Sequence, residues 1–125
     1  MRFRGMSVIG APLLLAALLV TPAKADDVEI VEASARQSGS TWTFSVTLKH
    51  GDTGWDHYAD LWQVFAPDGK LLGERVLLHP HVEEQPFTRS LSGVAIPDGI
   101  DEVVIRARDS VHGVADQEYR LVLPR

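Results

Sequence analysis

The stretch Thr41–Lys49, TWTFSVTLK, decides the fold class of this chain. Its apolar residues, Trp42, Phe44, Val46 and Leu48, alternate with polar ones. Side chains two apart in an extended chain point to the same face, so this pattern predicts a strand with one buried face.

The same alternation recurs at residues 103–109, VVIRARD, and at residues 119–124, YRLVLP. No segment of ten or more residues after the first 25 shows the 3.6-residue period of a helix, which indicates an all-β domain. Turn sequences separate the strands at residues 37–40, 50–56, 66–70, 79–86, 96–101 and 109–116. This arrangement predicts a seven-stranded Greek-key β-sandwich of immunoglobulin or fibronectin III type.

The first 25 residues have the layout of a secretory signal peptide. Arg2 and Arg4 precede the apolar run at residues 8–20, and Ala23 and Ala25 occupy the small positions of a cleavage site. We therefore expect a signal peptide at residues 1–25, cleavage, and a β-sandwich domain at residues 26–125. The mature protein is expected in the periplasm or outside the cell, with no membrane insertion after cleavage.

Charge and composition exclude several function classes. Removing Arg2, Arg4 and Lys24 leaves nine of the twelve basic residues against seventeen acidic ones, a net charge of −8. Such a chain repels phosphates, so we expect no nucleic-acid binding. The absence of cysteine excludes disulfides and thiolate nucleophiles. No catalytic arrangement of serine, histidine and carboxylate is recognisable, and we predict that the protein is not an enzyme.

Strand alternation is expected to bring three loops to one pole of the sandwich, because successive strands run in opposite directions. These loops follow the second, fourth and sixth strands. They contain all five histidines of the chain, which are His50, His57, His79, His81 and His112. Loops that converge on a rigid sandwich are a usual place for binding.

Imidazole and carboxylate groups gathered at one pole suit a divalent ion such as Zn²⁺, Cu²⁺ or Ni²⁺. The predicted ligands are His79, His81, His112 and His57, with Asp109 or Asp56 in support. His79 and His81 would face one way in an extended segment, and Pro80 would stiffen the pair. His50 and Asp52 are weaker candidates, because the ends of a loop are often far apart. A hydrogen-bonded histidine cluster without a metal is the structural alternative.

Trp55 and Tyr58 permit a second hypothesis, a metal-free adaptor domain. Trp55 follows Gly54 in a loop, beside polar residues. An exposed Trp–Tyr pair in this setting suits contact with a protein, a glycan or a small ligand. The alternative is that Trp55 lies over the end of the sandwich as a lid on its core.

Three segments carry a resemblance to known proteins. GWDHYAD, LLHPHVEEQPFTRSLSGV and DSVHG together resemble an uncharacterised family of small exported bacterial proteins. The resemblance implies export and the same sandwich fold, and it carries over no catalytic residues. A more general resemblance to immunoglobulin and fibronectin III domains concerns architecture alone, since the inter-sheet cysteine pair of antibody domains is absent here.

Overall fold

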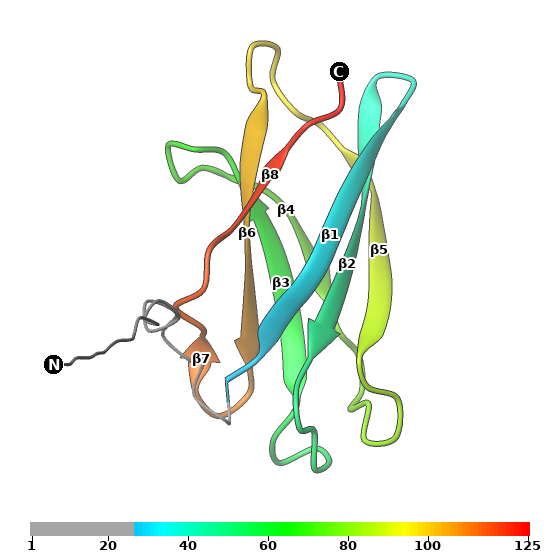
Figure 1. The fold of residues 1–125 in the computed structure, drawn as a ribbon, viewed down its shortest axis with the longest axis vertical. Coiled ribbons are helices and arrows are strands. Elements are labelled where there is room, and N and C mark those ends of the chain that lie inside the picture. Colours follow the sequence, from blue (N-terminus) through cyan, green and yellow to red (C-terminus); the bar gives the residue numbers. More distant parts are fainter. Residues whose placement is uncertain (1–26) are drawn as a thin grey trace, which may run out of the picture.

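A computed structural model describes residues 27–125, and the predicted signal peptide and its cleavage lie outside them. The described chain forms two antiparallel sheets that pack face to face (Figure 1). Its strands are β1 (Glu29–Ser38), β2 (Thr41–Lys49), β3 (Ala59–Phe65), β4 (Leu71–Val76), β5 (Phe87–Val94), β6 (Glu102–Asp109), β7 (Gly113–Val114) and β8 (Tyr119–Val122). The expectation of an all-β domain is confirmed, and no helix occurs between residues 27 and 125.

One sheet has the order β1-β2-β5, and the other has the order β4-β3-β6, with β7 and β8 both paired to β6. The strand count differs from the expected seven because Gly113 and Val114 form the short strand β7 within the segment 109–116, for which the sequence predicts a loop. No helix in the described part of the chain is long and apolar enough to cross a membrane.

The alternation in β2 and β6 builds the core as predicted. Trp42 is 1% exposed, and the three apolar residues that follow it at every second position in β2 are fully buried. In β6, Val103, Ile105 and Ala107 also face inward and are at most 2% exposed. The next residues in these two series are polar. His50 follows β2 and Asp109 ends β6, and both remain buried at one end of the core.

The open edge of β1 is partly closed by a side chain from the segment between β7 and β8. Gln117, just before β8, accepts a hydrogen bond from the Ile30 amide at 2.7 Å and donates one to the Ile30 carbonyl at 3.0 Å. This pairing copies the two bonds that a neighbouring strand would make. It lies beside the bulge between Ile30 and Glu32, where the β1–β2 register shifts.

Candidate metal centre

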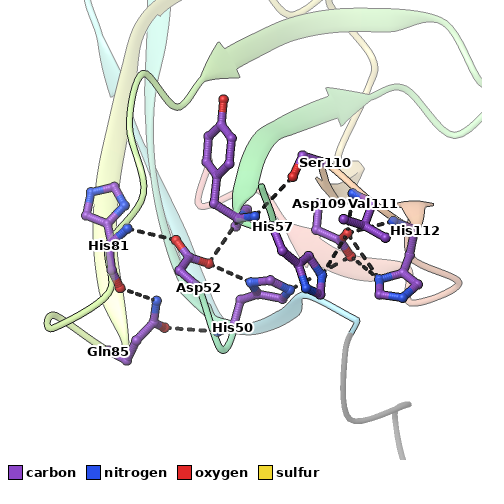
Figure 2. Close-up of polar contacts among 11 residues, drawn as sticks. His50, Asp52, His57, His81, Gln85, Asp109, Ser110, Val111 and His112 are labelled. Atoms are coloured by element: carbon purple, nitrogen blue, oxygen red, sulfur yellow. Dashed lines mark hydrogen bonds and ion pairs between the residues drawn. The ribbon is translucent and has the colours of Figure 1, made fainter. Parts of the chain in front are cut away.

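The loops after β2, β4 and β6 lie at the same end of the sandwich, the lower end in Figure 1. Side chains from these loops form a polar cluster at this end of the core, shown in Figure 2. The cluster centres on His50 and Asp109, the two polar residues that continue the inward faces of β2 and β6. Its position therefore follows from the period-two pattern of these two core strands.

His50 has a fixed ring orientation. Its Nδ1 lies 2.5 Å from Asp52 Oδ1, and both side chains are fully buried. A carboxylate can only accept, so Nδ1 carries a proton and donates it to Asp52, and Nε2 is directed away from Asp52. That Nε2 lies 3.9 Å from Asp109 Oδ2. Asp52 also accepts a hydrogen bond from the Ala59 amide at 3.1 Å, which ties it to the start of β3.

Asp109 is 1% exposed and is held by the turn that follows it. Its Oδ1 accepts hydrogen bonds from the Val111 amide at 2.8 Å and from the His112 amide at 2.7 Å. Burial by itself raises the pKa of Asp109, but these two amides and the positive charge that His112 and His50 can carry lower the pKa below its ordinary value. The carboxylate is therefore charged at neutral pH and supplies the negative charge at the centre of the cluster.

His57 completes the inner part of the cluster. A tight turn places it, with the His57 amide bonded to the Gly54 carbonyl at 3.2 Å. Its ring lies edge-on between His50 and His112, with centroid distances of 4.7 and 4.9 Å. His57 Nε2 lies 3.3 Å from Asp109 Oδ1, yet this buried nitrogen makes no hydrogen bond to any described group.

Within residues 27–125, two sets of side chains offer three potential metal-binding atoms within 4.8 Å of one another. One set is His50, His57 and Asp109, and the other is Asp27, Asp109 and His112. Ligands about 2.0–2.1 Å from a tetrahedral Zn²⁺ would be separated by about 3.3 Å. The distances from Asp109 to His57, 3.3 Å, and to His112, 3.2 Å, already have that size. His50 Nε2 lies 3.9 Å from the other oxygen of the Asp109 carboxylate.

The structure does not bring His79 and His81 into either set. His81 turns the other way, and its ring stacks on Phe87 with 3.9 Å between centroids. Its Nε2 lies 2.8 Å from the Arg89 guanidinium. Burial, followed by the positive charges of Arg89 and His79, lowers the pKa of His81. A guanidinium in this position opposes a second cation, so these two histidines do not form the predicted common site with His112.

The remaining predicted residues divide between the cluster and its surroundings. His57, His112 and Asp109 belong to the cluster, whereas Asp56 is exposed and belongs to neither set. His50, predicted as a weaker ligand candidate because it begins a loop, lies in the first set. The sequence does contain a pattern that predicts this position of His50. Residues at every second position of β2 face the core, and His50, two residues after Leu48, continues this series onto the buried face.

Trp55 is 67% exposed, so it does not act as a lid on the core. Its ring contacts Tyr58 edge-on, with 5.6 Å between centroids. Two hydrogen bonds hold Tyr58 against the turn after β6. The Tyr58 amide donates to the Ser110 hydroxyl at 3.0 Å, and the Ser110 amide donates to the Tyr58 carbonyl at 2.9 Å. The aromatic pair thus stands on a fixed backbone beside the histidine cluster.

Comparisons with known proteins give two similarities. A protein of Halomicrobium mukohataei named "Putative lipoprotein" is 41% identical over 105 residues, which cover 75% of this chain and 51% of that protein. The chain thus spans about half the length of this relative. A single-residue variant of the superoxide reductase (neelaredoxin) of Archaeoglobus fulgidus, in the reduced form, is 13% identical, with a TM-score of 0.44 over 87% of this chain and 100% of that structure. No protein-family model matches the chain.

Proposed function

We propose that this domain binds a divalent transition-metal ion through His50, His57 and Asp109, with His112 beside them. The observation that carries the proposal is the Nε2 atom of His57. This nitrogen is buried and makes no hydrogen bond to any described group, although it lies 3.3 Å from the charged carboxylate of Asp109. A buried polar atom without a partner is costly, and coordination of a metal ion would satisfy it.

The surroundings of the three ligands support this chemistry. Asp52 holds the Nδ1 proton of His50, an arrangement that fixes the tautomer and makes Nε2 a better donor to a metal. Two imidazole nitrogens and one carboxylate oxygen are ligands that Zn²⁺, Cu²⁺ and Ni²⁺ accept. The side chains of His57 and His112 are 20% and 37% exposed, so an ion can reach the cluster from solvent.

The alternative for the same residues is a metal-free cluster, in which a protonated imidazole neutralises Asp109. The two possibilities differ in their response to added metal. An ion bound to the folded state stabilises it by about 2.7 kcal/mol when free metal is at 100 times the dissociation constant. A metal-free cluster is indifferent to metal.

The test uses mature protein without a histidine tag, stripped with a chelator. Calorimetric titration and thermal unfolding are measured with Zn²⁺, Cu²⁺ and Ni²⁺ in turn. We expect one ion to raise the melting temperature of the parent protein, and His57→Ala to lose this shift. His79→Ala is the matched control, because His79 is exposed and belongs to neither ligand set. An unchanged shift in His57→Ala, or no shift in the parent protein, would refute the proposal.

A second candidate function is a binding surface around Trp55 and Tyr58, used by an adaptor domain without metal. The exposure of Trp55, on a backbone held by Ser110, favours this function. The partner would be a protein or a glycan, since exposed aromatic rings with nearby polar groups suit both. Trp55→Ala is expected to abolish partner capture and to leave metal binding unchanged.

We also propose that the protein acts in the cell envelope or outside the cell, as a non-enzymatic domain with an immunoglobulin- or fibronectin III-like topology. The predicted signal peptide and the name of the Halomicrobium mukohataei relative support export. The mature β-domain is then expected at residues 26–125. Fractionation of cells followed by mass spectrometry of the N-terminus tests both export and the cleavage site.

A further inference from the structure

The segment at residues 77–86, which connects β4 and β5, is joined to the candidate metal centre by two polar side chains. The first is Asp52. Its Oδ1 lies 2.5 Å from His50 Nδ1, and its Oδ2 accepts a hydrogen bond from the His81 amide at 2.8 Å. One buried carboxylate therefore contacts a proposed metal ligand and the backbone of the connecting segment at the same time, as Figure 2 shows.

The second bridge is Gln85. Its Oε1 accepts a hydrogen bond from the His50 amide at 2.9 Å, and its Nε2 donates to the His81 carbonyl at 2.9 Å. Together with Asp52, this amide holds both backbone polar groups of His81. The two bridges are independent in sequence, and both connect His50 with His81.

We propose that a metal ion at His50 orders residues 77–86 through Asp52 and Gln85. This inference rests on the proposed metal site. An ion on His50 Nε2 can bind only while the proton stays on Nδ1, so metal binding favours the ring position in which His50 donates to Asp52. The same position keeps Asp52 and the His50 backbone available to His81 and Gln85. Conformations in which the segment opens must break this arrangement, and they become rarer when metal is bound.

The ordered segment carries an exposed apolar surface. Leu78 is 73% exposed and Val82 is 53% exposed. These side chains flank His79 and His81, and they move with the backbone that Asp52 and Gln85 hold. Metal binding would thereby make the exposed apolar surface of residues 77–86 more ordered.

The test is hydrogen–deuterium exchange by mass spectrometry on the whole mature domain, with and without Zn²⁺. For peptides covering residues 77–86, we expect Zn²⁺ to slow exchange by about 5-fold or more in the parent protein. Gln85→Ala keeps the metal ligands and is expected to bind Zn²⁺, with less than about 2-fold slowing in this segment. Gln63→Ala is the matched control, since its side chain bonds Glu74 on the exposed surface of β3 and β4.

The outcomes separate the inference from the proposed function. If titration shows that none of Zn²⁺, Cu²⁺ and Ni²⁺ binds, the metal site itself is refuted; if only Cu²⁺ or Ni²⁺ binds, the exchange experiment is run with that ion. If Zn²⁺ binds but exchange in residues 77–86 is unchanged, or slows equally in Gln85→Ala, the coupling is refuted and the metal site stands. Should Gln85→Ala fail to fold, Gln85→Glu serves instead, because it keeps the acceptor for the His50 amide and lacks the donor for the His81 carbonyl.

Discussion

Replacement of Asp109 tests how the pole is held together in the absence of metal. The carboxylate is buried and accepts hydrogen bonds from the amides of Val111 and His112. Asp109→Ala removes the acceptor and leaves both amides without a partner, whereas Asp109→Asn keeps one oxygen that can accept from them. The two variants therefore separate the hydrogen bonds of the turn from the negative charge.

The expected magnitudes follow from these contacts. An amide left unsatisfied costs about 1–3 kcal/mol, so two such amides predict a loss of about 2–6 kcal/mol in the free energy of unfolding. Val111 and His112 are exposed residues, and water can reach part of this turn, which places the expected loss for Asp109→Ala at the lower end, about 2–3 kcal/mol. For Asp109→Asn, which weakens charged hydrogen bonds without removing them, we expect about 1 kcal/mol.

The assay is urea unfolding at pH 7 in the presence of a chelator, followed by tryptophan fluorescence. We expect the order parent, Asp109→Asn, Asp109→Ala, from most to least stable, with similar slopes of the unfolding free energy against urea concentration. If Asp109→Ala lies within about 0.5 kcal/mol of the parent, or if the two variants are equally destabilised, the account of the turn is wrong.

Asp109 also sets an acid limit on stability. Its pKa in the folded protein lies below the ordinary value of 3.8, so the unfolded chain takes up the proton more readily. The contribution of Asp109 to the free energy of unfolding is complete above the ordinary pKa, and it is lost as the pH falls through the pKa of the folded state. Asp109→Asn lacks this titration, and the difference between the two unfolding free energies is expected to shrink as the solution becomes acidic.

Three other predictions concern residues outside the metal ligands. Burial and the charge of Arg89 lower the pKa of His81 below 6.5, so the unfolded chain binds more protons than the folded one. The free energy of unfolding is therefore highest above this value and decreases as the pH falls below it. In urea titrations between about pH 7.5 and 5, we expect this decrease to be smaller in His81→Gln than in the parent protein. Trp55→Ala is expected to change the unfolding free energy by less than about 0.5 kcal/mol, because the ring is 67% exposed; a larger loss in thermal unfolding would mean that the ring supports the core. Arg108→Ala breaks a two-point contact with Asp60, at 3.0 and 3.1 Å, and should cost less than about 1 kcal/mol, less still in high salt; a salt-independent loss would contradict this surface assignment.

Period-two patterning predicts most of the fold, because burial dominates the choice of residues in β2 and β6. Trp42, Phe44 and Val46 face the core as expected, and the bounds of β2 match the predicted stretch Thr41–Lys49. The short strand β7 could not be predicted in this way. Two residues are too few to show any period, and the β6–β7 pairing is set by the tight turn held by Asp109.

The candidate site is only partly predictable from the sequence. Strand alternation correctly gathers the three loops at one pole, yet it does not fix which imidazoles meet. His81 is removed from the cluster by stacking on Phe87, a contact that depends on the course of the connecting segment. The buried positions of His50 and Asp109, in contrast, can be predicted from the strand patterns. Each lies two residues after the last apolar residue on the inward face of its strand.

The pairing of Gln117 with Ile30 has a consequence for the solubility of the domain. A strand at the border of a sheet offers free amides and carbonyls on which another chain can grow by the same hydrogen bonding, the first step of edge-to-edge aggregation. At Ile30 both groups are already bonded to one glutamine side chain. Gln117 thereby protects this part of β1 from pairing with a strand of another chain, and its uncharged amide does so independently of pH.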